Sequence, residues 1–138
     1  MVKKYKKISG SILVIGNEIL SGRTKDQNVS YLASWLNTNL GIKIYEVRIV
    51  QDEEKEIIKN LLNLSKNYNY VFTTGGIGPT HDDITAKSIS RAFKKKYIYN
   101  KEAYEILSKY YGKKEFNDSR KKMAKMPEGS KLIYNPSS

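Results

Sequence analysis

The stretch that most constrains the fold extends from Val71 to Thr85 and reads VFTTGGIGPTHDDIT. Its first residues are apolar or β-branched, which is typical of a buried strand over residues 70–74. The next five positions hold three glycines and a proline, which are Gly75, Gly76, Gly78 and Pro79. Thr80 is then a candidate N-cap for a helix over residues 82–96. The sequence therefore predicts a strand that leads through a loop of bare backbone into a helix.

Such a loop has a clear candidate ligand. The first turn of a helix presents unpaired N–H groups and the positive end of the helix dipole, which suit a phosphate. The candidate phosphate-binding residues are Thr74, Gly75, Gly76 and Gly78. The alternative is that the glycines serve only the backbone conformation or close packing. The two common phosphate fingerprints do not fit, because His81 takes the place of the last glycine in G-x-G-x-x-G and no Gly-Lys-Ser/Thr follows.

A second glycine-bounded segment follows the first predicted strand, Ser11–Ile15. Gly16 and Gly22 bracket Glu18 in the run GNEILSG. Open α/β sheets bind ligands beyond the carboxyl ends of their strands, so Gly16 and Glu18 are candidate ligand contacts. The alternative for Glu18 is an exposed position in an ordinary turn.

The next two elements have clear periodicity. A helix is predicted to begin at Asp26 or Asn28 and to end before Gly41, with Trp35 assigned to the core. A strand is predicted over residues 42–50. Asp52 follows this strand and precedes a helical apolar stripe at residues 57–62, so Asp52 is either a helix cap or a carboxylate of the site.

Three strand–helix units in succession predict the architecture. Right-handed crossovers between parallel strands place the helices on both faces of a sheet, so we expect a three-layer α/β/α fold with a mostly parallel sheet. Residues 1–10 are expected to be a basic lead-in. Beyond residue 96 the patterns predict a short strand, two helices and a last strand, over residues 97–99, 101–111, 117–125 and 131–134.

Composition narrows the class of protein. With 138 residues, 39% of them hydrophobic and 28% charged, the chain is expected to form one globular domain. The net charge of +11 comes from lysines that are spread along the chain, so a nucleic acid is not the expected partner. The chain has no Cys, and it has neither a signal-peptide core nor the roughly 20 apolar residues of a membrane helix. A cytoplasmic protein without membrane attachment is the expectation.

The run TTGGIGPTHDDIT resembles the signature of the molybdopterin-binding (MoaB/MogA-like) domain family, and its GP-T-x-DD form resembles the amino-terminal domain of CinA proteins. Further matches are GNEILSG, the N-x-x-Y-L run at Asn28, the V-x-D that ends in Asp52, and the N-x-x-R-x-x-x-A-x-x-P-E-G pattern that starts at Asn117. The resemblance covers Ser11 to Ser138. Domains of this family usually extend through a further strand and helix, so we expect a single domain over residues 11–138 whose C-terminal part is missing.

The resemblance implies a small nucleotide or pterin ligand and leaves the activity open. The chain is expected to hydrolyse the pyrophosphate of ADP-ribose, to adenylylate molybdopterin, or to bind molybdopterin or a nucleotide without catalysis. The Asp82–Asp83 pair favours the CinA-like hydrolysis. Family members form trimers or dimers, so a homo-oligomer is one option.

The resemblance also assigns roles to the acidic residues. Asp52 and Asp83 are the candidate catalytic residues and are expected to approach each other across neighbouring strand ends. Because carboxylates repel phosphates, Mg²⁺ or another divalent cation is expected between them, with Asp82 and Asp83 as its ligands. Asn28 is expected either to face the ligand or to cap its helix.

Overall fold

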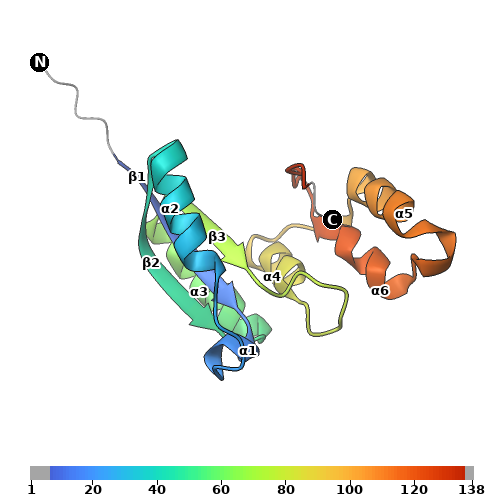
Figure 1. The fold of residues 1–138 in the computed structure, drawn as a ribbon, viewed down its shortest axis with the longest axis horizontal. Coiled ribbons are helices and arrows are strands. Elements are labelled where there is room, and N and C mark those ends of the chain that lie inside the picture. The colour runs from blue at the N-terminus through green and yellow to red at the C-terminus, as the bar shows by residue number, and fades with distance from the viewer. Residues whose placement is uncertain (1–6, 136–138) are drawn as a thin grey trace, which may run out of the picture. The chain divides into compact units, whose positions relative to one another are not determined.

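The computed structural model describes residues 7–135 of the chain. The chain forms two compact units, Met1–Thr74 and Gly75–Ser138 (Figure 1). The N-terminal unit contains β1 (Ile8–Ile15), α1 (Asn17–Leu20), α2 (Asn28–Leu40), β2 (Ile42–Val50), α3 (Glu54–Asn67) and β3 (Tyr70–Thr74). The C-terminal unit contains α4 (Thr85–Ala92), β4 (Tyr97–Tyr99), α5 (Lys101–Glu115), α6 (Asp118–Lys121), the 3₁₀ helix η1 (Lys122–Ala124) and β5 (Lys125–Pro127).

The N-terminal unit is built on a parallel sheet with the strand order β2-β1-β3. β1 lies in the middle, and its consecutive residues Ile12 and Leu13 are both 0% exposed. Because consecutive strand residues point to opposite faces, both faces of β1 are covered. Right-handed crossovers account for this, since the chain moves from β1 to β2 through α2 and back across β1 to β3 through α3. The predicted α/β architecture with a parallel sheet is confirmed.

β1 begins earlier than the sequence predicted, at Ile8 instead of Ser11. A register shift between Gly10 and Ser11 in the pairing with β2 explains why the pattern was missed. Gly10 is needed there for close packing, since a Cβ on it would lie 2.9 Å from Cδ1 of Ile44. The predicted lead-in therefore loses residues 8–10, and residues 1–6 lie outside the described part.

The prediction for Trp35 is wrong. Its side chain is 44% exposed, and Leu36 is the residue of α2 that is buried. Neighbouring positions on a helix point about 100° apart, so only one of these two residues can face the sheet. The end of the helix is as predicted, because Gly41 adopts the left-handed conformation with φ 65°.

The C-terminal unit pairs β4 with β5 in an antiparallel sheet, and α4 packs against both strands. The predicted strand over residues 131–134 is wrong, because Ile98 pairs with Met126 and the chain has left the sheet before residue 131. Ile133 is 92% exposed. The predicted helix over residues 117–125 is shorter, since α6 and η1 together end at Ala124 and Lys125 is in β5.

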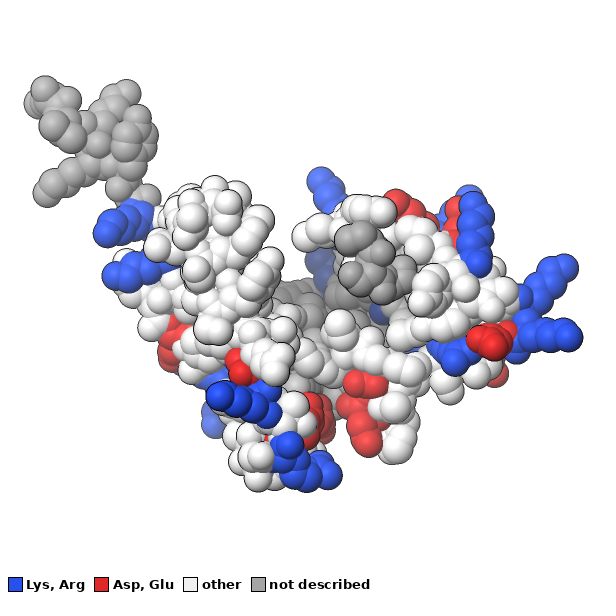
Figure 2. Space-filling view, in the orientation of Figure 1, with Lys and Arg blue, Asp and Glu red and all other residues white. Residues whose placement is uncertain are grey.

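Charged side chains do not form one basic patch on the face seen in Figure 2. Lysines and arginines are dispersed over both units and alternate with acidic and uncharged surface. Within residues 7–135, no helix is both long and apolar enough to cross a membrane.

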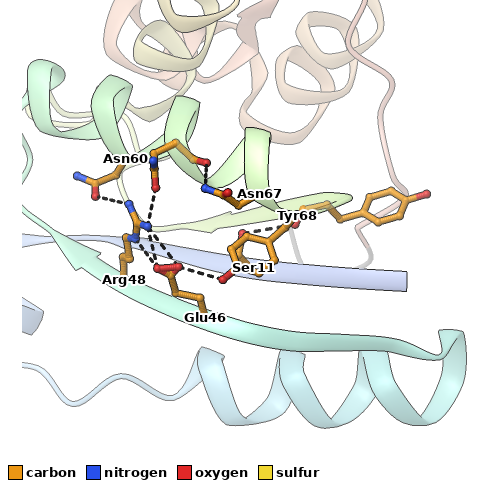
Figure 3. A network of polar contacts seen from close by, with 8 residues as sticks. Ser11, Glu46, Arg48, Asn60, Asn67 and Tyr68 are labelled. Carbon is orange, nitrogen blue, oxygen red and sulfur yellow. Dashed lines mark hydrogen bonds and ion pairs between the residues drawn. The ribbon is translucent and has the colours of Figure 1, made fainter. Parts of the chain in front are cut away.

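A network of hydrogen bonds links α3 to β2 in the N-terminal unit (Figure 3). The Arg48 guanidinium donates to the Glu46 carboxylate at 2.8 Å and to the side-chain oxygens of Asn60 and Asn63 at 3.1 and 2.7 Å. The Tyr68 hydroxyl donates to the same Glu46 carboxylate at 3.2 Å. The network connects both ends of the β2–α3–β3 crossover and satisfies charges that are partly buried.

Candidate functional site

The glycine loop, residues 75–84 between β3 and α4, has two positions at which the backbone conformation requires glycine. Gly75 and Gly76 have φ values of 87° and 63°, in the left-handed region. A residue with a Cβ would cost about 1–2 kcal/mol at each position. The start of α4 holds this conformation, because Thr85 donates its hydroxyl to the Gly75 carbonyl at 2.8 Å and its amide to the Gly76 carbonyl at 3.2 Å. The loop is therefore attached to the helix that follows it.

Thr85→Val tests this attachment, because valine keeps the shape of threonine and removes only the hydroxyl. Thr85 is 1% exposed, so the Gly75 carbonyl should lose a donor that water cannot easily replace. We expect the free energy of unfolding, measured by urea denaturation, to fall by about 1–2 kcal/mol. Thr38→Val on the exposed surface of α2 is the control and should change stability little. Equal stability of the two variants would contradict the attachment.

Asp83 organises the second half of the loop. Its Oδ2 accepts hydrogen bonds from the Thr80 amide at 2.9 Å and from the Thr80 hydroxyl at 2.7 Å. A Cβ on Gly78 would lie 2.7 Å from the same oxygen, so glycine is needed at this position for close approach. The predicted N-cap role of Thr80 is wrong, since its hydroxyl donates to Asp83 and α4 begins only at Thr85. A carboxylate that competes for nearby N–H groups favours a turn over an earlier helix start.

The Asp83 carboxyl is held in its charged form. Desolvation by its surroundings works against ionisation, but the hydrogen bonds from Thr80 and from the Gly78 amide, together with the charge of Lys122, lower the pKa of Asp83 below its ordinary value. The Lys122 ammonium also donates a hydrogen bond to the Thr80 carbonyl. At neutral pH the loop thus carries an ionised carboxylate beside a lysine.

These groups line a cavity of about 200 Å³ in the C-terminal unit. Its wall comes from the glycine loop, α4, β4, η1 and β5, and consists of Gly76, Ile77, Gly78, Asp83, Ala86, Tyr97, Lys122, Met123, Lys125 and Met126. Two lysines and one aspartate are the charged residues of this wall, and the aromatic and methionine side chains make much of the rest apolar. The volume is below the roughly 300 Å³ at which pockets for drug-sized ligands begin, so the cavity fits one part of a nucleotide or pterin.

The structure separates the two residues predicted as metal ligands. Asp83 lines the cavity, whereas Asp82 does not and lies with its Oδ1 3.1 Å from Nε2 of His81. The side chains of Asp82 and His81 are 75% and 93% exposed. Within residues 7–135 no group of three His, Asp or Glu side chains is arranged to hold a metal ion.

Other predicted residues lie at the carboxyl edge of the sheet in the N-terminal unit. The Asp52 carboxylate accepts from the Asn17 amide at 3.0 Å, and the Asn17 side-chain oxygen accepts from the Asp52 amide at 3.2 Å. These reciprocal bonds join the ends of β1 and β2. Asp52 is not the cap of α3, because Glu53 occupies the N-cap position.

Gly16 and Glu18 belong to the same edge. The Gly16 amide donates to the Val50 carbonyl at 3.0 Å, and a Cβ on Gly16 would lie 2.6 Å from a carboxylate oxygen of Glu18. Gly16, Glu18 and Asp52 thus follow adjacent strands, β1 and β2. Asn28 is the exposed first residue of α2, and the capping bonds come from Asp26, which accepts from the Asn28 and Val29 amides.

The expectation that Asp52 and Asp83 follow neighbouring strands is wrong. Asp52 follows β2, and the loop with Asp83 follows β3, but β1 lies between these strands. The topological switch point of this sheet is at β1, because β2 lies on one side of it and β3 on the other. Thr74, the last residue of β3, pairs with Val14 and so lies at this switch, where open α/β sheets bind ligands.

Sequence reasoning missed much of the cavity wall. Lys122, Tyr97 and Met126 were not predicted as site residues, although each lines the cavity. Lys122 occupies one of the unspecified positions of the N-x-x-R-x-x-x-A pattern that begins at Asn117, so this pattern gave no signal for it. Tyr97 and Met126 have no signal in the sequence, since they meet only through the pairing of β4 with β5.

The chain matches, over residues 11–137, the family model described as "Probable molybdopterin binding domain". It is 40% identical over 129 residues to a CinA-like protein of Fusobacterium nucleatum, in a match that covers 93% of this chain and 32% of that protein. It spans about half the length of three archaeal relatives, from Archaeoglobus fulgidus, Metallosphaera sedula and Sulfurisphaera tokodaii.

Solved structures agree with this match. The crystal structure of CinA from Thermoplasma acidophilum, a protein with unknown function, has a TM-score of 0.86 and 30% identity, over 94% of this chain and 76% of that chain. The tungsten cofactor synthesizing protein MoaB from Pyrococcus furiosus has the same fold, with a TM-score of 0.59 and 24% identity over 78% of this chain and 64% of that chain. The chain therefore belongs to the molybdopterin-binding-domain family, and it is similar to the CinA-type proteins within that family.

Proposed function

We propose that this domain binds a nucleotide diphosphate at the cavity beside the glycine loop and hydrolyses the pyrophosphate of ADP-ribose with the help of a divalent cation. One observation carries the proposal: a glycine loop, an ionised Asp83 and two lysines line one cavity in a CinA-like chain. Backbone N–H groups and lysines suit phosphate oxygens. An apolar wall beside them suits a planar ring.

The residues present are compatible with a divalent cation. Mg²⁺ is commonly held by one or two carboxylates together with substrate phosphates and water, so a ready-made group of three acidic side chains is not required. Asp83 would hold the cation at the cavity, whereas Asp82, the other predicted ligand, does not line the cavity. A cation bound there would supply Lewis-acid neutralisation of the phosphate oxygens. The roles predicted for Asp52 and Glu18, which lie on the N-terminal unit, remain predictions.

A second candidate function is ligand binding without catalysis, with molybdopterin or a nucleotide as the ligand. The small cavity volume, about 200 Å³, favours it, because such a cavity would enclose only part of ADP-ribose. A binding module would bind AMP or ADP-ribose and leave both unchanged.

The experiment that tests the proposal is a measurement of AMP release from ADP-ribose by the purified chain. Mg²⁺, Mn²⁺ and no added metal are compared, with EDTA as the metal-free control, and binding of AMP and ADP-ribose is measured in parallel by calorimetry. Metal-dependent AMP release that EDTA abolishes is the expected result. Binding without release would replace the enzyme by the binding module. A folded chain that neither binds nor releases AMP would contradict both.

A further inference from the structure

Lys122 connects two parts of the C-terminal unit that are far apart in the sequence. It is the first residue of η1, and its ammonium donates a hydrogen bond to the carbonyl of Thr80 in the glycine loop. Thr80 in turn donates its amide and its hydroxyl to Asp83. The chain of contacts from η1 to the Asp83 carboxylate therefore passes through a single loop residue.

The second lysine of the cavity is oriented differently. The Lys125 ammonium lies 5.0 Å from the ring centroid of Tyr97 and 5.1 Å from that of Tyr99, so its charge is engaged with two aromatic faces. Lys122 instead lies beside the glycine loop and acts on the charge of Asp83. Of the two lysines in the cavity wall, Lys122 is thus the one placed at the candidate phosphate site.

We propose that Lys122 is a positioning residue of this site, which fixes the glycine loop through Thr80 and gives the cavity a positive wall for a phosphate-bearing ligand. This inference rests on the proposed function and adds to it the residue that orders the loop.

The chemistry of lysine suits both parts of this role. An ammonium has three N–H donors, and the Thr80 carbonyl uses one of them. The other two can donate to ligand oxygens. The same positive charge offsets the negative charge of Asp83, which otherwise would repel an anion from the loop. Loss of the ammonium should therefore loosen the loop and also weaken anion binding.

The test uses Lys122→Met, which keeps an unbranched side chain of similar length and removes the charge, together with Lys122→Arg. Lys121→Met is the matched control, because Lys121 is the preceding residue, lies 3.9 Å from the exposed Asp118 and does not line the cavity. Two quantities are measured in the full chain: the Kd for ADP, with inorganic pyrophosphate as a second probe, and hydrogen exchange of the peptide covering residues 76–84. Circular dichroism checks that each variant is folded.

For Lys122→Met we expect the Kd for ADP to rise on the order of tenfold and exchange in the loop peptide to become faster. Lys122→Arg should restore most of the affinity, and Lys121→Met should match the wild type in both measurements. An unchanged Kd in Lys122→Met, while the wild type binds ADP, would overturn the proposal for Lys122 and leave the proposed function standing. If the wild type binds neither probe, the proposed function fails, and unchanged loop exchange in Lys122→Met would then overturn the role of Lys122 as well.

Discussion

Asp83→Asn should reduce metal-dependent AMP release from ADP-ribose on the order of 100- to 1,000-fold, while the Kd for AMP changes only a few-fold. Asparagine keeps an oxygen that can accept the two hydrogen bonds from Thr80, so the loop can retain its shape. It removes the negative charge that a divalent cation requires. The variant therefore removes the negative charge of the site while it keeps the conformation of the loop. Steady-state AMP release and calorimetric binding are the two measurements.

The matched control for this prediction is Asp118→Asn. Asp118 lies in α6 of the same unit, and its side chain is fully exposed and does not line the cavity. We expect its rate of AMP release to equal that of the wild type. Equal rates for Asp83→Asn and the wild type would show that Asp83 has no role in the chemistry, and would leave it as a residue that only shapes the loop.

Gly78 lies on the other side of the contact with the Asp83 carboxylate, and the reason for glycine there differs from the reason at Gly75 and Gly76. The Asp83 carboxylate lies where a Cβ on Gly78 would be, so glycine at 78 serves the carboxylate, whereas glycine at 75 and 76 serves the backbone angle. Two physical reasons for glycine therefore occur within four residues. The sequence alone could not assign one reason to each position, because it shows neither φ values nor neighbours.

The N-terminal unit could be predicted well from the sequence because its signals are local. β2 and β3 have the predicted bounds, since each is a run of apolar or alternating residues that ends at polar residues or glycine. Trp35 shows the limit of this approach. Two adjacent apolar residues both fit the helical period, and only packing against the sheet shows that Leu36 is the one buried.

The C-terminal unit was harder to predict because long-range contacts decide between local alternatives. Thr80 could cap a helix, but its hydroxyl donates to Asp83 and its carbonyl accepts from Lys122, 42 residues away. The end of the chain has the same difficulty. The sequence predicts a strand over residues 131–134, but β4 pairs with residues 125–127 instead. Register against a partner is not a property of either segment alone.

The candidate site also contains residues that the sequence could predict and residues that it could not. Gly76, Gly78 and Asp83 were predicted because they stand in one continuous motif, and the structure places all three on one cavity. Lys122 and Tyr97 come from η1 and β4, and no local pattern connects them with the loop. A sequence can thus indicate the residues that a motif brings together, while the opposite wall of the cavity depends on the tertiary fold.

Leu13→Ala should destabilise the N-terminal unit by about 3 kcal/mol, within the 2–5 kcal/mol range for such a truncation. Leu13 is 0% exposed in the central strand β1, and its neighbours Ile12 and Val14 pack on the opposite face. A cavity there cannot be filled easily, because the strand is paired on both edges by β2 and β3. Urea unfolding followed by tryptophan fluorescence measures the effect. Trp35 is the single tryptophan, so the signal reports on this unit.

Leu40→Ala is the control for the same chemical change at the surface. Leu40 is the last residue of α2 and is 54% exposed, so little transfer free energy and no enclosed cavity are involved. We expect its free energy of unfolding to fall by less than about 1 kcal/mol. Similar losses for the two variants would contradict the placement of β1 at the centre of the sheet. A large loss for Leu13→Ala alone would support it, because only an enclosed side chain leaves a cavity when it is truncated.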